Sequence, residues 1–96
     1  MVAVEKSVAP WYEKYIHRMA GVQGGYPVVK GTRIPVSTIV LKYIRVYPGD
    51  LHAIQRAYPH LTPTQIRAAL AYSEHHRDVI DEDIRRHEEA LEALKR

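Results

Sequence analysis

The sequence predicts a mainly helical domain in which an N-terminal strand and a β-hairpin precede a three-helix bundle. Three observations favour this fold class. The first third of the chain is rich in β-forming residues and is interrupted by glycine and proline. Apolar residues then recur at helical spacing, and no glycine or proline follows Pro63. The last two helices follow each other across a tight turn, which is the layout of a helix-turn-helix, and the final helix is long.

The β-rich part begins after residues 1–10, which are predicted to be a flexible leader. Within Trp11–Met19 the side chains alternate in type towards the C-terminal end, which favours a strand. Residues 20–25 contain two consecutive glycines and predict a turn. Val28-Val29 and Ile34 flank the tripeptide Lys30-Gly31-Thr32, so this stretch predicts a short hairpin that turns at the glycine.

The first two helices are predicted over residues 36–46 and 51–58. Asp50 is the expected N-cap of the second helix, and Pro59 ends that helix. The apolar positions of the first helix have helical spacing and form its expected buried face, which comprises Val36, Ile39, Val40, Tyr43 and Ile44.

The start of the third helix is the clearest local signal in the chain. Thr62 occupies the expected N-cap, and Pro63 follows at the first helical position, where its missing N–H costs nothing. Gln65 lies three residues after Thr62, so the two side chains can close a capping box. A helix is therefore expected to begin here.

This helix can continue to the C-terminus, with a weak break near residues 75–78. Residues 66–76 are expected to be a core helix of a domain that spans residues 11–77. Residues 78–96 are then expected to form a separate, acidic, amphipathic helical tail that contacts a partner protein or a second copy of the chain. The expected anchors of that contact are Ile80, Ile84, Leu91 and Leu94.

Charge divides the chain at the same place. Residues 1–77 carry 10 basic and 4 acidic side chains, a net charge of +6, and residues 78–96 carry 4 basic and 7 acidic ones, a net charge of −3. A basic body with an acidic tail suggests two surfaces with different partners, although a solvated acidic helix is the plainer interpretation.

The helix-turn-helix layout makes DNA a candidate partner. The N-terminal residues of the second helix of such a motif meet base edges, so Gln65 is a candidate reader of adenine. Ala68 and Ala71 are expected on the same exposed face, where they would allow a close approach. A three-helix bundle that only resembles a DNA reader is the alternative. The candidate DNA-binding residues are Lys30, Arg33, Arg56, Thr64, Gln65 and Arg67.

Several kinds of chemistry find no support in the sequence. The chain has no cysteine, which excludes disulfides, cysteine-ligated zinc and cysteine nucleophiles. Its six histidines do not have the spacing of a metal site, and no serine lies in a glycine-flanked elbow. The acids between Asp78 and Asp83 are expected to be solvated rather than to bind Mg²⁺. We therefore expect no catalytic, metal-binding or cofactor-binding residues, no cofactor and no enzyme activity, and a small metal-dependent hydrolase is disfavoured.

No apolar run is long enough for a membrane span, and no signal-peptide core is evident, so a cytoplasmic protein without membrane contact is expected. The string from Gly24 to Val36 (GGYPVVKGTRIPV) closely resembles the signature of domain of unknown function 433, a bacterial and archaeal family. Residues 58–62 and 66–72 are also similar to that family's pattern, in the expected order, and the resemblance covers about residues 15–76. Tyr26 and Leu51 depart from the residues usual in that family.

The resemblance implies a homeodomain-like or winged three-helix domain with an N-terminal β-hairpin. It also implies an antitoxin-like component of a type II toxin–antitoxin pair, whose toxin resembles a PIN-domain ribonuclease. The expected function is then neutralisation of that toxin together with binding of the operon's own double-stranded promoter DNA. A homodimer is also expected, because the core is small, a strand edge near the N-terminus is open and the tail carries an apolar stripe. The alternative is a protein-interaction module that forms a homodimer through its β-hairpin and C-terminal helix and does not bind DNA.

Overall fold

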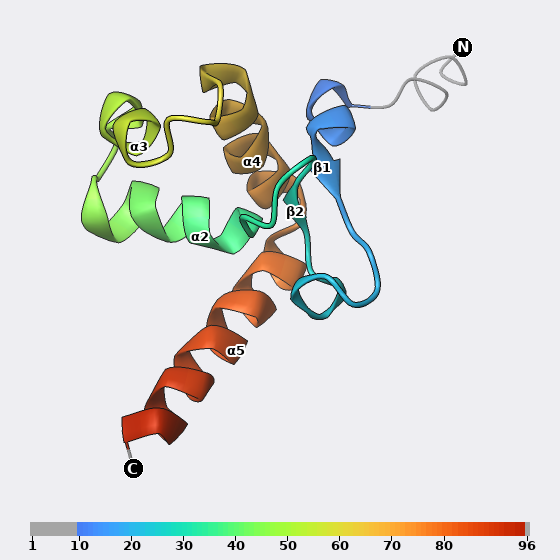
Figure 1. Ribbon diagram of the computed structural model, residues 1–96, viewed down its shortest axis with the longest axis vertical. Coiled ribbons are helices and arrows are strands. Elements are labelled where there is room, and N and C mark those ends of the chain that lie inside the picture. The colour runs from blue at the N-terminus through green and yellow to red at the C-terminus, as the bar shows by residue number, and fades with distance from the viewer. Residues whose placement is uncertain (1–9, 96) are drawn as a thin grey trace.

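The computed structural model describes residues 10–95, which form a mainly helical body with a small two-stranded sheet on one side (Figure 1). Of the predicted leader, all but Pro10 lies outside the described residues. The helices are α2 (Val36–Leu41), α3 (Leu51–Ala57), α4 (Pro63–His75) and α5 (Arg77–Lys95). Among the described residues, no helix is both long and apolar enough to cross a membrane.

The predicted N-terminal strand is much shorter than expected. Residues Trp11–Tyr15 form a 3₁₀-helix, η1, and only Ile16–His17 form strand β1. Side chains three residues apart share one side of a 3₁₀-helix, so Tyr12 and Tyr15 both face the body. Tyr12 is buried, with its ring edge-on to Tyr72 of α4 at 6.1 Å. The burial of Tyr12 explains why β-forming residues adopt a helical turn here.

The hairpin turns at Gly31 as predicted, with a φ of 84°. Strand β2 (Val28–Val29) pairs antiparallel with β1, in the register Ile16 to Val29 and His17 to Val28. The returning arm of the hairpin is only a bridge between Val28 and Pro35. The Thr32 hydroxyl donates a hydrogen bond to the Val29 carbonyl at 2.8 Å and accepts one from the Ile34 N–H at 3.0 Å. The turn is therefore held by its own side chain.

The first predicted helix is present but changes its geometry halfway. α2 continues into a π-helical turn, η3 (Lys42–Val46), which closes with a hydrogen bond from the Tyr47 N–H to the Lys42 carbonyl at 2.7 Å. A π-turn holds one more residue than an α-turn, so the α-helical register that placed Ile44 inside does not apply. Ile44 is 59% exposed, and its predicted burial is wrong.

The predicted caps of the next two helices are confirmed. The Asp50 carboxylate accepts a hydrogen bond from the Ala53 N–H at 3.0 Å at the start of α3. At the start of α4, Thr62 and Gln65 close the capping box, and Pro63 lies in the first turn. The Gln55 side-chain amide donates to the Leu61 carbonyl and so holds the connection between α3 and α4.

The predicted break in the long helix is also confirmed. α4 ends at His75, and His76 has non-helical backbone angles before α5 begins at Arg77. The imidazole of His76 stacks on the ring of Tyr72, with centroids 4.1 Å apart. Burial raises the pKa of the Tyr72 hydroxyl above its ordinary value, so this ring stays neutral beside the break.

The start of α5 belongs to the body, which corrects the expectation of a tail without a partner inside the domain. Ile80 is only 2% exposed and forms part of the hydrophobic core. It therefore cannot anchor a partner protein, and Ile84 is half-buried against the same core. The core side chains are Tyr12, Val29, Val36, Ile39, Val40, Ile54, Leu61, Ile66, Ala68, Ala69, Tyr72 and Ile80.

Asp83 was expected to be a solvated acid, and it is fully buried instead. Its carboxylate accepts a hydrogen bond from the Ser37 hydroxyl in the first turn of α2, at 2.8 Å. Arg86 donates two further hydrogen bonds to it, from Nη2 at 2.8 Å and from Nε at 3.2 Å. A buried carboxylate needs such partners, because it has lost the hydrogen bonds of water.

The same arginine connects α5 to the short 3₁₀-helix η2 (Gln23–Gly25) and the loop around it. The Arg86 guanidinium lies over the ring of Tyr26, 4.6 Å from its centroid, and donates to the Gln23 carbonyl at 3.4 Å. A Cβ on Gly24, which has a φ of 65°, would lie 3.9 Å from the guanidinium carbon. The Asp83–Arg86 pair therefore fixes the direction of α5 against both α2 and the loop.

We predict that Asp83→Asn lowers the free energy of unfolding by about 1.5–3 kcal/mol, because it keeps the shape of the side chain but removes charge-assisted hydrogen bonds. Urea unfolding followed by circular dichroism measures the change. The control is Asp81→Asn, an exposed acid of the same helix, which should leave the free energy of unfolding nearly unchanged. Equal effects of the two substitutions would contradict the assigned role of Asp83.

Candidate interaction surfaces

The helix pair α3 and α4 carries no acid between its N-cap Asp50 and Glu74. Its cationic side chains Arg56 and Arg67 are exposed, as are His52 and His60. Across residues 14–73 the chain has eight Lys and Arg side chains and one acid, which caps α3. This part of the surface therefore has a positive electrostatic potential that is suited to an anionic partner.

The exposed strip of α4 differs from the one that the sequence predicted. Ala68 was expected to face solvent, and it is fully buried together with Ala69. The two alanines face the core because α4 packs against both α2 and η1, and small side chains allow the close approach. The strip that faces solvent contains Arg67 and Glu74, with Thr64 and Ala71 partly exposed beside them.

Gln65 is not free to read a base. Its side-chain oxygen accepts a hydrogen bond from the Thr62 N–H at 2.7 Å, and the Thr62 hydroxyl accepts one from the Gln65 N–H at 3.1 Å. Recognition of adenine needs both the oxygen and the nitrogen of the amide. In this geometry Gln65 therefore serves the capping box, a role that the Thr62–Gln65 spacing also predicts.

The candidate DNA-binding residues fall on two separate surfaces. Arg67 lines a groove of about 140 Å³ between α3 and α4, together with His52. Lys30 and Arg33 instead line an open hollow on the hairpin together with His17. The two histidines were not among the residues that the sequence singled out. A histidine by itself is a weak signal, and only the fold places these two beside arginine or lysine.

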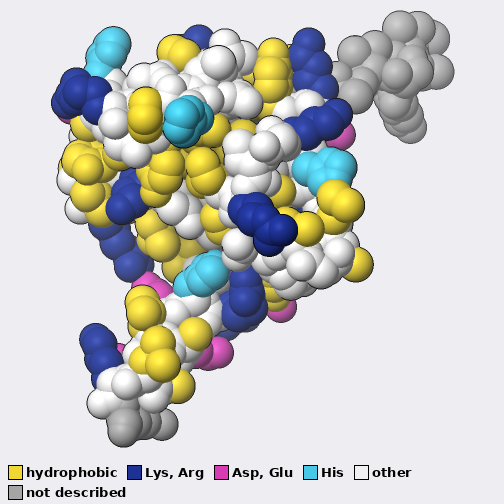
Figure 2. Space-filling view, in the orientation of Figure 1, with side chains coloured by type: hydrophobic (Ala, Val, Ile, Leu, Met, Phe, Trp, Pro, Cys, Tyr) yellow, Lys and Arg dark blue, Asp and Glu magenta, His cyan; other side chains and the backbone are white. Residues whose placement is uncertain are grey.

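The acids of α5 gather on one face. Residues three and four positions apart share a helix face, so one face of α5 carries six acids and one arginine. Asp81 and Glu88 lie at the edge of this face nearest the body, where Asp81 borders a cavity and Glu88 pairs with Arg45. In Figure 2 most of the visible acidic side chains lie on α5, whereas lysine and arginine are spread over the body above it. The exposed side chains of this outer face are Asp78, Asp81, Glu82, Arg85, Glu88, Glu89 and Glu92.

No group of three or more histidine or acidic side chains within residues 10–95 could hold a metal ion. The Arg45–Glu88 ion pair at 2.9 Å joins η3 to α5, and both side chains are largely exposed, so it adds little stability. The described surfaces offer charge and shape for binding.

A small helical domain with a basic helix pair and an acidic outer helix face is the class of molecule that these observations define. The family is shown by comparison of sequences: residues 16–73 match the family described as "Protein of unknown function (DUF433)", and the chain belongs to this family. The matched segment ends before α5. No curated protein matches the chain.

A solved structure agrees with this assignment. The crystal structure of a DUF433 member protein from Anabaena variabilis ATCC 29413 is similar to this chain, with 34% sequence identity and a TM-score of 0.63. The similarity covers 73% of this chain and 67% of the other. The fold described above is therefore also found in a solved member of the same family.

We predict that Gln65→Ala lowers the free energy of unfolding by about 0.5–1 kcal/mol, because it removes one half of the capping box. Gln65→Glu should keep the stability, since a glutamate at this position closes the same box. Thermal unfolding of both variants measures the difference. A loss of stability in Gln65→Glu as large as in Gln65→Ala would show that the cap is not the role of this side chain.

Proposed function

We propose that this chain is an antitoxin-like regulator, which binds double-stranded DNA through α3 and α4 and a basic partner protein through the outer face of α5. The observation that carries the proposal is the separation of charge between these two surfaces. A single partner of either sign would be attracted by one surface and repelled by the other. Two partners of opposite charge fit the chain better.

DNA fits the first surface because exposed arginine side chains contact phosphate oxygens. Arg67 in the second turn of α4 and Arg56 in the last turn of α3 are exposed and have no acidic neighbour within α3 or the first three turns of α4. The α3–α4 pair acts in this proposal as a helix-turn-helix, with α4 approaching the major groove. Because the Gln65 side chain is held in the capping box, Thr64 and Arg67 are the side chains of α4 that can reach the DNA.

A ribonuclease of the PIN-like class fits the second surface, as the resemblance to antitoxins implies. An enzyme that binds RNA presents a basic cleft to it. The outer face of α5 offers a row of carboxylates held on a rigid helix, which can occupy such a cleft in place of RNA phosphates. In this proposal the chain neutralises the toxin by competition for its substrate-binding surface, and has no enzymatic role itself.

The alternative is an interaction module that does not bind DNA. Two observations favour it: the Gln65 side chain is held in the capping box, and Ala68 is buried. Fewer side chains of α4 can therefore contact base edges than in a typical recognition helix. The two proposals differ in one measurable property, because only the first requires salt-dependent binding to the DNA upstream of the gene.

We predict that Arg67→Ala weakens binding to the upstream DNA at all sequences and lowers the salt slope by about one, as the loss of one phosphate contact does. Fluorescence anisotropy between about 50 and 200 mM salt measures both quantities. The control is Arg85→Ala, which removes the one arginine of the outer face of α5 and should leave DNA binding intact. Absence of binding by the unchanged protein at the lowest salt would favour the alternative.

We predict that Glu82→Lys together with Glu89→Lys abolishes capture of a co-expressed PIN-like protein, because the charge reversal turns attraction to a basic cleft into repulsion. Affinity purification of the tagged chain measures the capture. The matched control is Lys30→Glu together with Arg33→Glu on the hairpin. Loss of capture in this control, with capture retained in the α5 variant, would show that the partner binds the hairpin and not the outer face of α5.

A further inference from the structure

The apolar stripe of α5 continues beyond the body on which the helix packs. Ile80 is buried and Ile84 half-buried, whereas Leu91 is 59% and Leu94 82% exposed. The spacing of these residues keeps them on one side of the helix, opposite the acidic outer face. Figure 1 shows that the C-terminal turns of α5 run away from the rest of the chain, and Figure 2 shows hydrophobic side chains gathered on them. We call Glu88–Lys95 the protruding end.

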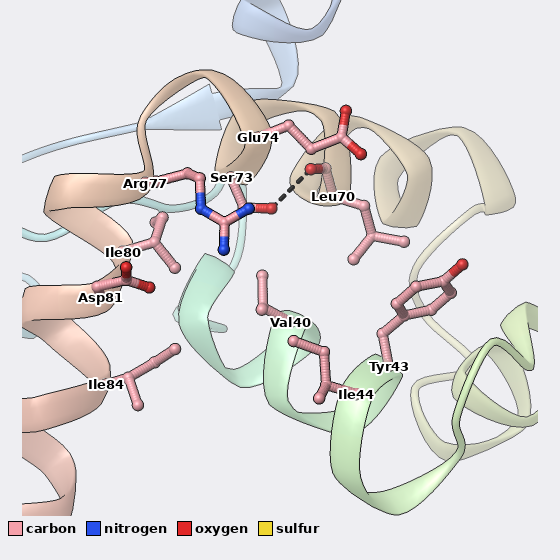
Figure 3. Close-up of a pocket in the computed structure, with 10 residues that line it drawn as sticks. All are labelled: Val40, Tyr43, Ile44, Leu70, Ser73, Glu74, Arg77, Ile80, Asp81 and Ile84. Carbon is pink, nitrogen blue, oxygen red and sulfur yellow. Dashed lines mark hydrogen bonds between the residues drawn. The ribbon is translucent and has the colours of Figure 1, made fainter.

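The same chain has a groove of matching chemistry. A cavity of about 210 Å³ opens where α2 and η3, the end of α4 and the start of α5 meet. In Figure 3 the side chains of Val40, Ile44, Leu70, Ile80 and Ile84 point into it from three directions. The groove is therefore apolar at its floor and along two walls, and its exposed rim at Ile44 has no cover from the described chain.

The borders of the groove and of the protruding end both carry mixed charge. Arg77 lines the groove together with Glu74 and Asp81, and Glu92 and Lys95 flank the leucines on the protruding end. The Arg45–Glu88 pair shows that the η3 side of the groove lies next to the first residue of that end. Opposite charges can thus be paired when one protruding end lies in another groove.

We propose that the groove is filled by the protruding end of a second copy of this chain, and that two copies exchange these ends about a two-fold axis. The C-terminal turns of α5 run away from the rest of the chain (Figure 1), and Leu91 and Leu94 do not line the groove of their own chain. A two-fold pair covers two grooves and two apolar ends at once, because each copy supplies both. A different partner protein would cover only the groove or only the protruding end.

This pairing leaves the central side chains of the acidic outer face exposed, namely Asp78, Glu82, Arg85 and Glu89, because they lie on the opposite side of the helix from the apolar stripe. Asp81, Glu88 and Glu92 lie at the edge of that face, next to the paired surface. The dimer and the proposed binding of a basic protein therefore use different sides of one helix. The pairing does not rest on the proposed function, and its tests need neither DNA nor a partner protein.

The absence of cysteine allows a direct test by cross-linking. Ile44→Cys and Leu94→Cys are prepared as separate single variants, mixed and oxidised. We expect a disulfide-linked species of twice 11.0 kDa that forms in the mixture and only weakly in either variant alone. The matched control mixes Lys30→Cys, on the hairpin, with Leu94→Cys, and should give no such species. Equal cross-linking in the control, or stronger cross-linking of Leu94→Cys with itself, would overturn the exchange of ends.

Sedimentation equilibrium at micromolar concentration gives an independent measurement. The unchanged protein should have a mass near twice 11.0 kDa. Leu91→Glu with Leu94→Glu should raise the dissociation constant by about tenfold or more, because two apolar side chains lose their burial. Glu89→Gln on the outer face is the control and should not change it. Circular dichroism should show the same helix content in all three proteins, and a monomeric unchanged protein would overturn the proposal.

Discussion

The position of α5 depends on one buried carboxylate. Asp83 is fully buried and accepts hydrogen bonds from Ser37 in α2 and from Arg86 in its own helix. It also lies beside the N-terminal turn of α2, where the peptide dipoles favour negative charge. Removal of Arg86 would leave the buried carboxylate without this counter-ion, which costs more than the pair itself contributes. This contact sets the direction of α5, and therefore also the directions in which its acidic face and its apolar stripe point.

The same contact explains part of the signature string. Gly24 and Tyr26 near its start lie against Arg86, and Ser37, directly after Val36 at its end, binds Asp83. Between them, Gly31 has a positive φ and Thr32 closes the hairpin turn through its own hydroxyl. These residues therefore have structural roles, which they perform without any ligand. The charged side chains between them, Lys30 and Arg33, remain exposed and free to bind.

The molecule combines two kinds of surface on a small core. The body that precedes α5 is almost free of acids, and α5 presents its acids outward while its buried side completes the core. A rigid connection between the body and α5 is needed if binding on one surface is to change binding on the other. The single non-helical residue His76, stacked on Tyr72, and the Asp83 contact supply that connection.

The sequence by itself determined the features that depend on neighbours along the chain: the caps at Asp50 and Thr62, the turn at Gly31, the break near His76 and the family. These are local, since a cap or a turn needs only a few consecutive residues. It also singled out Lys30, Arg33, Arg56 and Arg67, all of which are exposed. Only the tertiary structure decided that Ile80 and Asp83 are buried, that Ile44 is exposed and that Ala68 faces the core. Burial depends on which distant element covers a helix face, and a helical period cannot show how far along α5 the body extends.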